Sequence, residues 1–222
     1  DADPGSQHAF LRQTDGTFET IDHPGQGFNY AFRINDPGQI GGYYFEFPST
    51  PSGIFITSHL REPDGSFAQR LFSTEGDGTV LRGLNNDATQ AGWWLAPDGS
   101  IHGIVGANGV FAQFDVPGAA FTLPNDINDA GTIAGFAADA TFEGQGFVRL
   151  ADGTFDFLAV PGAHSTEVLG INKRGQLVGA YEDEQGNLHG FIATAVAEPH
   201  SLLLFALGAM GWRCATRRRN HV

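Results

Sequence analysis

The sequence is short of cysteine, and of basic residues outside its C-terminus. Cys214 is the only cysteine among the 222 residues, so disulfide bonds and thiol chemistry are excluded from residues 1–197. Four of the 12 basic residues lie in the last ten positions, which leaves 8 basic and 24 acidic residues in 1–197, because Glu198 is the only later acid. A surface with this excess of negative charge repels phosphate backbones, and the sequence has neither a basic stripe nor a glycine-rich phosphate loop. Nucleic acid is therefore not an expected partner.

Apolar residues at helical spacing are also missing from the body of the chain. No stretch within the repeats described below keeps a period of 3.6 residues over three turns, so no helix is expected there. The composition is 41% hydrophobic and 17% charged, which is typical of a folded domain. The 31 glycines can supply turns, and the 19 phenylalanines can supply packing between sheets. The composition therefore favours an all-β domain.

One motif recurs four times along the chain. Its first anchor is an Asp-Gly or Asn-Gly pair that begins at positions 15, 64, 108 and 152, with spacings of 49, 44 and 44. Its second anchor is an asparagine after Ile or Leu at positions 35, 85, 128 and 172, with spacings of 50, 43 and 44. Because two independent anchors give one period, we infer an internal repeat of about 44 residues.

Each repeat predicts four short strands. In the first repeat, residues 8–12 and 17–21 flank the hairpin signal Asp15-Gly16, and residues 30–34 and 39–45 flank a second turn that begins at Asn35. Four short strands in about 44 residues match one blade of a β-propeller, whereas the coils of a β-solenoid, the alternative, usually repeat at a shorter period. The sequence thus predicts an all-β repeat propeller of about four blades, with about four antiparallel strands in each.

A fifth copy of the opening strand, residues 189–193, follows the last repeat. The strand count works if each blade begins with the third strand of one repeat and ends with the second strand of the next. The N-terminal hairpin, residues 8–22, is then expected to join the last blade and close the ring. Such closure would remove exposed sheet edges.

The C-terminal residues 196–222 differ in character from the rest of the chain. Residues 201–212 form an apolar run of about 12 residues, which is shorter than the roughly 20 that a spanning helix needs. An arginine cluster follows this run and would stay on the cytoplasmic side of a membrane. We expect a short hydrophobic helix here and only transient contact with the membrane.

This tail resembles the PEP-CTERM sorting signal of Gram-negative bacteria, which combines a Pro-Glu-Pro-like motif, a short hydrophobic helix and terminal arginines. The matching residues are Glu198, Pro199, Arg213, Arg217, Arg218 and Arg219. Ala197 stands where the first proline of the motif is expected. The resemblance implies export, cleavage near Glu198-Pro199 by an exosortase-type membrane enzyme, and a role among exopolysaccharide or biofilm matrix components. An export signal before Asp1 is expected as well.

Residues 1–195 resemble the HAF-repeat family of extracellular proteins. The triplet that gives the family its name occurs as His8-Ala9-Phe10 and, with glycine, at 189–191, and variants of it begin at Thr57, His102 and Gln145. The similarity covers residues 8–193, and we take 1–195 as the repeat domain and 196–222 as the sorting tail. The family carries no established activity, so the resemblance implies no catalytic residue.

Repeat-matched polar residues are the first candidates for chemistry. His8, His102 and His189 share one position, so in a closed ring they could converge on a metal, or each could hydrogen-bond a neighbouring turn. Each repeat asparagine precedes a turn, which its side chain typically stabilises. Asp22 and Asp115 also share one position and could either form an acid–base pair or cap strand ends.

Calcium is the one cofactor that the sequence suggests. In residues 126–131, Asp126 and Asn128 supply oxygens at the first and third positions of an EF-hand-like loop, and Gly131 stands at the sixth. Ala130 and Ala137 occupy the fifth and twelfth positions, where two ligands are missing. The alternative is the asparagine turn found in the other repeats.

Aromatic residues in the last strand of each repeat are the candidate ligand contacts. They are Tyr43, Tyr44, Trp93, Trp94 and Tyr181. Neighbouring side chains on a strand face opposite ways, so one member of each pair is expected to pack between blades while the other faces out. An outward tryptophan or tyrosine suits stacking on a sugar, and packing of both members is the alternative.

These patterns predict an exported, cell-surface or extracellular protein that works as a non-catalytic binding or matrix module for exopolysaccharide or envelope components. Solvent exposure of Trp93 or Trp94 beside Asp or Asn side chains would favour sugar binding. Burial of both would favour a second hypothesis, a structural envelope protein without a small ligand. The third hypothesis, a glycan-active hydrolase or lyase, requires two carboxylates, or a histidine and a tyrosine, that face one cleft.

Overall fold

Seventeen β-strands and no helix make up residues 7–46 and 55–194, the part of the chain that the computed structural model describes. The strands are β1 (Ala9–Arg12), β2 (Phe18–Ile21), β3 (Asn29–Ile34), β4 (Ile40–Glu46), β5 (Phe55–Arg61), β6 (Phe67–Arg70), β7 (Gly78–Leu84), β8 (Gln90–Leu95), β9 (Ile101–Ala107), β10 (Val110–Phe114), β11 (Phe121–Ile127), β12 (Ile133–Ala138), β13 (Gly144–Arg149), β14 (Phe155–Leu158), β15 (Ala163–Ile171), β16 (Leu177–Asp183) and β17 (Leu188–Ala193). The predicted all-β class is confirmed for these residues.

Two predictions concern residues outside this part of the chain. The tail 196–222, with its predicted hydrophobic helix, lies outside the described residues, and so do the sorting-signal residues Glu198, Pro199, Arg213, Arg217, Arg218 and Arg219. Within 7–46 and 55–194, no helix has the length and the apolar character that a membrane crossing requires.

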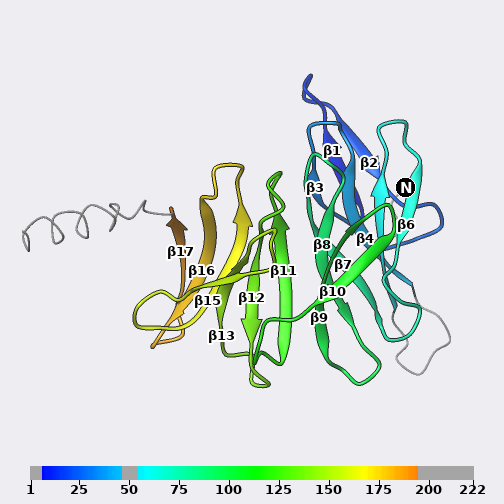
Figure 1. Ribbon diagram of the computed structural model, residues 1–222. Coiled ribbons are helices and arrows are strands. Elements are labelled where there is room, and N and C mark those ends of the chain that lie inside the picture. The colour runs from blue at the N-terminus through cyan, green and yellow to red at the C-terminus, as the bar shows by residue number, and fades with distance from the viewer. Residues whose placement is uncertain (1–6, 47–54, 195–222) are drawn as a thin grey trace, which may run out of the picture.

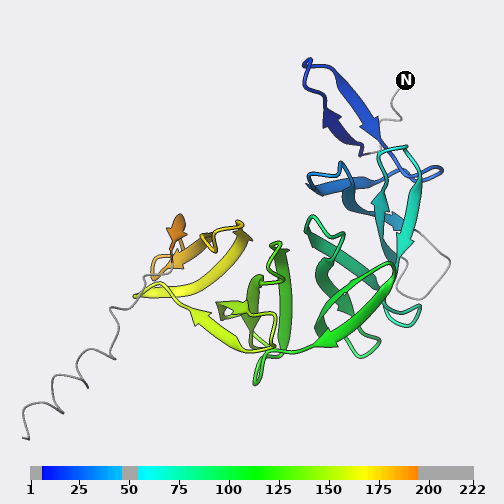
Figure 2. The same cartoon turned by 45° about the horizontal axis from the view of Figure 1, so that its top comes forward.

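Three sheets of four antiparallel strands follow one another along the chain, and we call them blades: β3–β6, β7–β10 and β11–β14. Each blade takes two strands from one repeat and two from the next, as the strand count predicted. The blades are arranged along an arc (Figures 1 and 2), and single parallel bridges such as Ile56–Gly78 join neighbouring blades. A two-stranded sheet, β1–β2, precedes the blades, and a three-stranded sheet, β15–β17, follows them.

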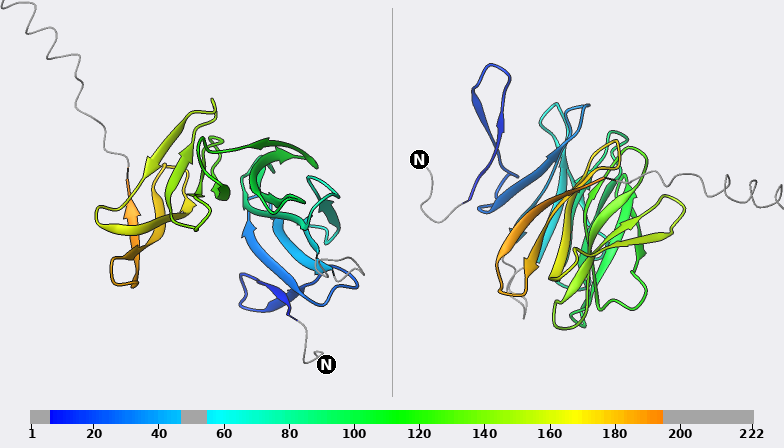
Figure 3. Two further views of the ribbon diagram at one scale, coloured as in Figure 1. Left: turned by 90° about the horizontal axis from the view of Figure 1, so that it is seen from below. Right: turned by 90° about the vertical axis from the view of Figure 1, so that its left-hand side faces the viewer.

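The predicted closure of the ring by the N-terminal hairpin is wrong. Strands β1 and β2 pair with each other, and a bridge from Gln7 to Phe28 places this hairpin beside the first blade, at the opposite end of the arc from β17 (Figure 3). The Gln7–Phe28 bridge matches the bridge Ile101–Phe121 between the second and third blades. Strands β1 and β2 therefore correspond to the third and fourth strands of a blade, and they form a sheet of their own. The hairpin cannot close the ring as predicted, because β17 pairs with β16 and occupies the third-strand position of the last sheet, which β1 would need.

The turn signals of the sequence are hairpin turns in the structure, as predicted. Gly16 and Gly109 have φ values of 91° and 79°, a left-handed conformation that glycine adopts without steric cost. In the first turn, the Asp15 carboxylate accepts hydrogen bonds from the backbone N–H (2.9 Å) and the hydroxyl (2.7 Å) of Thr17. The same contact with a Ser or Thr two residues later is made by Asp64, Asp98, Asp139 and Asp152.

Apolar packing and short hydrogen-bonded loops hold each blade against the next. Ala91, Ile127, Ile133 and Phe147 form a buried cluster between the second and third blades. Fully burying one side chain of the size of isoleucine or phenylalanine contributes about 1.5–3 kcal/mol. The loops between sheets are fastened by buried hydroxyls, because the backbone N–H groups of Phe72, Val116 and Val160 donate to Thr79, Thr122 and Thr166 at 3.0 Å each. These threonines lie on β7, β11 and β15, the strands that contact one another on the inside of the arc.

Candidate functional site

The two tyrosines of the first blade face opposite sides of the sheet, as expected for neighbours on a strand. Tyr44 is only 1% exposed, its ring stacks on His23 (4.3 Å between ring centres) and its hydroxyl accepts a hydrogen bond from Gln69 (3.0 Å). The prediction that Tyr44 contacts a ligand is therefore wrong, because the ring is already covered by its own blade and the hairpin. Tyr43 is half-buried on the other side, 4.8 Å from the ring of Tyr30. Burial raises the pKa of both hydroxyls.

The other predicted aromatic contacts differ in how they present their polar tips. Trp93 is half-buried, and its Nε1–H is buried without a hydrogen-bond partner among the described residues. Trp94 is half-buried too, but its Nε1–H donates to the Gln113 side chain (3.2 Å) at an exposed position. Tyr181 stacks on His189 (5.0 Å) in the last sheet. Of the aromatic residues predicted from the sequence, Trp94 thus has the contacts most suited to a polar ligand.

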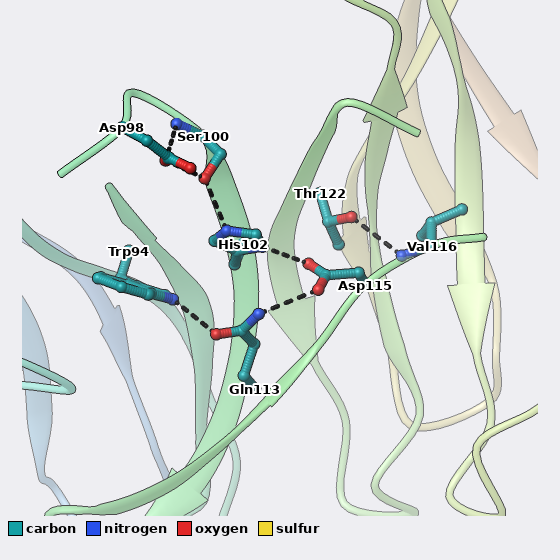
Figure 4. Close-up of polar contacts among 8 residues, drawn as sticks. All are labelled: Trp94, Asp98, Ser100, His102, Gln113, Asp115, Val116 and Thr122. Carbon is teal, nitrogen blue, oxygen red and sulfur yellow. Dashed lines mark hydrogen bonds and ion pairs between the residues drawn. The ribbon is translucent and has the colours of Figure 1, made fainter. Parts of the chain in front are cut away.

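Trp94 belongs to a polar cluster on one edge of the second blade (Figure 4). Its ring stacks on His102 of the neighbouring strand (5.7 Å), and the Nδ1 atom of His102 lies 2.9 Å from Asp115. Gln113 joins the two ends, since its amide N–H donates to Asp115 (3.0 Å) and its carbonyl accepts from Trp94. The Asp115 side chain remains 44% exposed. We call Trp94, His102, Gln113 and Asp115 the Trp94 cluster.

Ser100, His102 and Asp115 have the order of a nucleophilic triad, but the serine is committed elsewhere. The Ser100 hydroxyl lies 2.7 Å from Nε2 of His102, and it also contacts Asp98 at 2.5 Å. That second contact is the turn contact made by Ser or Thr in four other hairpins, and it lowers the pKa of the Asp98 carboxyl. Ser100 therefore acts as a turn residue, and the arrangement gives no free nucleophile.

The histidines that share a repeat position do not converge. Each pairs with a carboxylate of its own sheet: His8 with Asp22, His102 with Asp115, and His189 with Asp183 (2.8 Å). The hydrogen bonds from His189 and from the Asn187 backbone hold the pKa of Asp183 well below its usual range.

The hypotheses of a shared metal and of a carboxylate pair are therefore both wrong for these residues. Asp22 and Asp115 follow β2 and β10, which the whole first blade separates. In the described part of the chain, no group of three or more His, Cys, Asp or Glu side chains could hold a metal ion.

The repeat asparagines stabilise their turns, as predicted, and also connect the blades. The Asn85 side-chain oxygen accepts from the backbone N–H groups of Asp87 and Thr89, and its amide donates to the carbonyl of Asn128 (3.3 Å). The equivalent amides of Asn35 and Asn128 donate to the carbonyls of Asn85 and Asn172. The repeat asparagines thus form a ladder of hydrogen bonds from one sheet to the next, which we call the asparagine ladder.

The calcium hypothesis is wrong for residues 126–131, because the protein itself occupies the oxygens. Asp126 accepts from Arg33 (3.1 Å) and from the backbone N–H of Ile127 through Oδ1, and from the N–H of Ile171 through Oδ2. The Asn128 oxygen accepts from two backbone N–H groups of its turn.

Every innermost strand of the arc carries a β-bulge at the same repeat position. The pairing shifts around Phe32 in β3, Arg82 in β7, Asn125 in β11 and Leu169 in β15, each three residues before the repeat asparagine. A bulge re-aims the side chain of the extra residue. The neighbouring strand makes room for it with a glycine at 42, 92, 135 or 179, where a Cβ would overlap a carbonyl oxygen of the bulged strand.

The side chains of the four bulge residues meet at one cavity. Phe32, Arg82, Asn125 and Leu169, together with Arg33, line a cavity of about 180 Å³, which we call the axial cavity. Arg82 donates to Asn125 (3.0 Å) and lies over the ring of Phe32 (5.7 Å). Asn125 in turn donates to Glu167 (3.0 Å). This arrangement can present two guanidinium groups and an apolar wall to a small ligand.

The axial residues were not found from the sequence. When the repeats are aligned on their asparagines, the position three residues earlier is Phe, Arg, Asn and Leu in turn. The next position varies as well, from Arg33 and Gly83 to Asp126 and Gly170, so the alignment does not single out the bulge residue.

No protein-family model matches the sequence, and no curated protein matches it. Among solved structures, TolB from Acinetobacter baumannii is similar with a TM-score of 0.51 and 12% identity, over 83% of this chain and 48% of that one. Virginiamycin B lyase from Staphylococcus aureus (TM-score 0.48, 10% identity, 85% and 64% covered) and a gluconolactonase from Xanthomonas campestris (0.48, 14%, 83% and 65%) are also similar.

The likeness at these identities concerns the fold alone. The chain spans about half to two thirds of the length of these three solved structures. Together with three consecutive four-stranded blades, the similarity to TolB shows that the chain has a β-propeller-like fold.

Proposed function

We propose that the protein is an exported, non-catalytic binding module for extracellular polysaccharide, and that the Trp94 cluster contacts the sugar. The observation that carries this proposal is the position of Trp94, whose indole N–H is held by Gln113 at an exposed edge beside His102 and the Asp115 carboxylate. An aromatic ring with a polar tip suits the apolar face and the hydroxyls of a sugar. Because the side chains already hold one another in place, little ordering cost remains for binding.

We also propose that the chain is a HAF-repeat protein with one propeller blade for each repeat, and that its tail is a PEP-CTERM-like sorting signal. The period of about 44 residues and the recurring His–Asp pairs support the first part. The order of motif, apolar run and arginines supports the second. An exosortase-type enzyme would then be the processing partner in a Gram-negative envelope, with delivery to the surface or the medium.

The sorting proposal can be tested in cells. When the full-length chain is expressed in a host that has an exosortase, we expect mass spectrometry of the secreted product to show cleavage near Glu198-Pro199. The double variant Glu198→Ala, Pro199→Ala is expected to remain uncleaved and associated with the membrane fraction. Equal processing of the variant and the native chain would contradict the sorting assignment.

A structural envelope protein without a small ligand is the second candidate function. The burial of Tyr44 and of the Trp93 Nε1 atom favours it, because both belong to packing rather than to a surface. The third hypothesis, a hydrolase or lyase, has less support, because Asp22 and Asp115 are separated by a blade and each pairs with its own histidine.

Glycan binding tests the main proposal. The full-length protein is applied to an array of neutral and acidic polysaccharides, and the best ligand is then titrated by calorimetry. We expect Trp94→Ala to weaken binding about tenfold or more, because truncating an aromatic anchor typically costs more than 1 kcal/mol. Phe142→Ala is the control, since Phe142 is 56% exposed and stacked on Phe121 outside the cluster. Absence of glycan binding, with Trp94→Ala merely less stable, would favour the structural candidate.

A further inference from the structure

We propose that the axial cavity is a second binding site, independent of the Trp94 cluster, which takes the carboxylate of an acidic sugar residue such as a uronic acid. The argument starts from charge. The cavity is lined by Phe32, Arg33, Arg82, Asn125 and Leu169, so two cations and no acid face it. Residues 1–197 carry only 8 basic side chains against 24 acidic ones, so two guanidinium groups in one small cavity depart from the composition of the whole chain.

The two arginines differ in how they are satisfied. Arg33 is paired with Asp126 (3.1 Å), and its Nη2 donates to the carbonyl of Leu169 (3.4 Å). Arg82 has no carboxylate within ion-pair distance among the described residues, and its Nε atom is buried without a hydrogen-bond partner there. A partly buried cation without a counter-charge is costly, and a bound anion would relieve that cost.

The shape and chemistry of the walls limit the class of anion. Asn125 is fixed between Arg82 and Glu167, so the guanidinium is held in one orientation. A planar carboxylate fits the fork of a guanidinium. Phe32 and Leu169 offer apolar surface to the body of the ligand.

Charge and size narrow the ligand further. A single negative charge matches the single unpaired arginine, and the acidic body of the protein disfavours a dianion such as phosphate. At about 180 Å³, the cavity is smaller than a typical ligand pocket of roughly 300–1,000 Å³ and suits one sugar residue rather than a chain.

Repeat symmetry argues that the cavity is not merely structural. The bulge recurs in four strands, so the fold requires it, but its residue is Phe, Arg, Asn or Leu. Arg149 shows what a structural counterpart looks like: its guanidinium lies 4.8 Å over Phe114 and its Nε is also unpartnered, yet it lies outside the axial cavity. Arg82 differs from Arg149 because its side chain lines the axial cavity.

The test is a calorimetric titration of the full-length protein with galacturonate, tetragalacturonate, galactose and inorganic phosphate. We expect galacturonate to bind at least about tenfold more tightly than galactose, because a hydrogen bond to a charged group contributes about 1.5–3 kcal/mol. Tetragalacturonate that binds as tightly as the monomer, or more tightly, would identify a chain end as the source, and weaker binding would identify a free acid. Galactose equal to galacturonate, or phosphate binding without galacturonate binding, would overturn the proposal.

Two variants and one control connect the binding to the cavity. Arg82→Met is expected to weaken galacturonate binding about 10- to 100-fold, whereas Arg149→Met, the matched control, is expected to leave it unchanged. Leu169→Trp fills the cavity at a side chain that is 43% exposed, so it keeps the test valid if Arg82→Met does not fold. Unchanged galacturonate binding in a folded Arg82→Met or Leu169→Trp protein would refute the assignment.

Discussion

Two positions of the repeat, three residues apart, behave in opposite ways. The turn position is asparagine in all four repeats, and each of Asn35, Asn85 and Asn128 fastens its own turn and the next blade. The bulge position differs in every repeat and points into the axial cavity. The comparison teaches that the recurring asparagine joins the blades, whereas the bulge keeps its backbone conformation while its side chain differs from repeat to repeat.

The glycine opposite each bulge should give the largest effect. In Gly92→Ala the new Cβ would overlap the Val80 carbonyl oxygen, and backbone atoms cannot move aside as a flexible side chain can. We expect a loss of stability on the order of 3–5 kcal/mol or failure to fold, measured by urea unfolding. Gly27→Ala is the control, since nothing lies within 4 Å of a Cβ there. A well-folded Gly92→Ala protein of native stability would mean that the bulge is not needed.

His59 also departs from the repeat pattern. It occupies the position at which the other two blades have the buried residues Ile104 and Phe147. Its ring is 1% exposed with both nitrogens unpartnered among the described residues, and burial, then repulsion from His23, lowers its pKa from 6.5 to about 4. Since the unfolded chain binds the proton more readily, stability is full above about pH 6.5 and falls as the pH drops toward 4. The loss should reach about 3 kcal/mol.

The pH effect is measured by urea unfolding at a series of pH values. His59→Phe should remove most of the loss between pH 6.5 and 4. His164→Gln, the control, replaces a half-exposed histidine beside Glu143, and this variant should still lose stability between pH 6.5 and 4. An identical pH profile for the native protein and His59→Phe would show that the buried ring is not the acid-sensitive group.

The asparagine ladder predicts unequal effects of the same substitution. Asn85→Ala removes two acceptor contacts to its turn and one donor contact to the next blade, which should cost about 2 kcal/mol. Asn172→Ala should cost about 1 kcal/mol, because its amide donates to Gln176 within its own turn rather than across to another blade. Thermal unfolding of both variants measures the difference, and equal losses would argue against a role of the ladder between blades.

The bulge side chains should affect stability least. Leu169→Ala changes a partly exposed side chain at the cavity and is expected to shift the free energy of unfolding by no more than about 0.5 kcal/mol. A loss above 2 kcal/mol would place Leu169 in the core and weaken the contrast between turn and bulge positions.

Much of the fold was predictable because it depends on local patterns. The Asp-Gly turns, the four strands per repeat and the mixing of two repeats in one blade follow from turn chemistry and period. The candidate site was predicted only in part. Trp94 was among the expected contacts, but its partners Gln113 and Asp115 reach it from β10 and the loop that follows, and only the pairing of β9 with β10 brings them together.

The sequence by itself determined the all-β class, the repeat and the turns, because each depends on residues close together in the chain. Only the tertiary structure decided which strands lie at the two ends of the arc, where β17 occupies the position predicted for β1. It also decided which aromatic side chains are buried. The axial cavity likewise exists only in the tertiary structure, because its lining residues come from four separate strands: Phe32, Arg33, Arg82, Asn125 and Leu169. A bulge changes where one side chain points without leaving a mark in the local pattern, so its consequence is visible only when the strands are assembled.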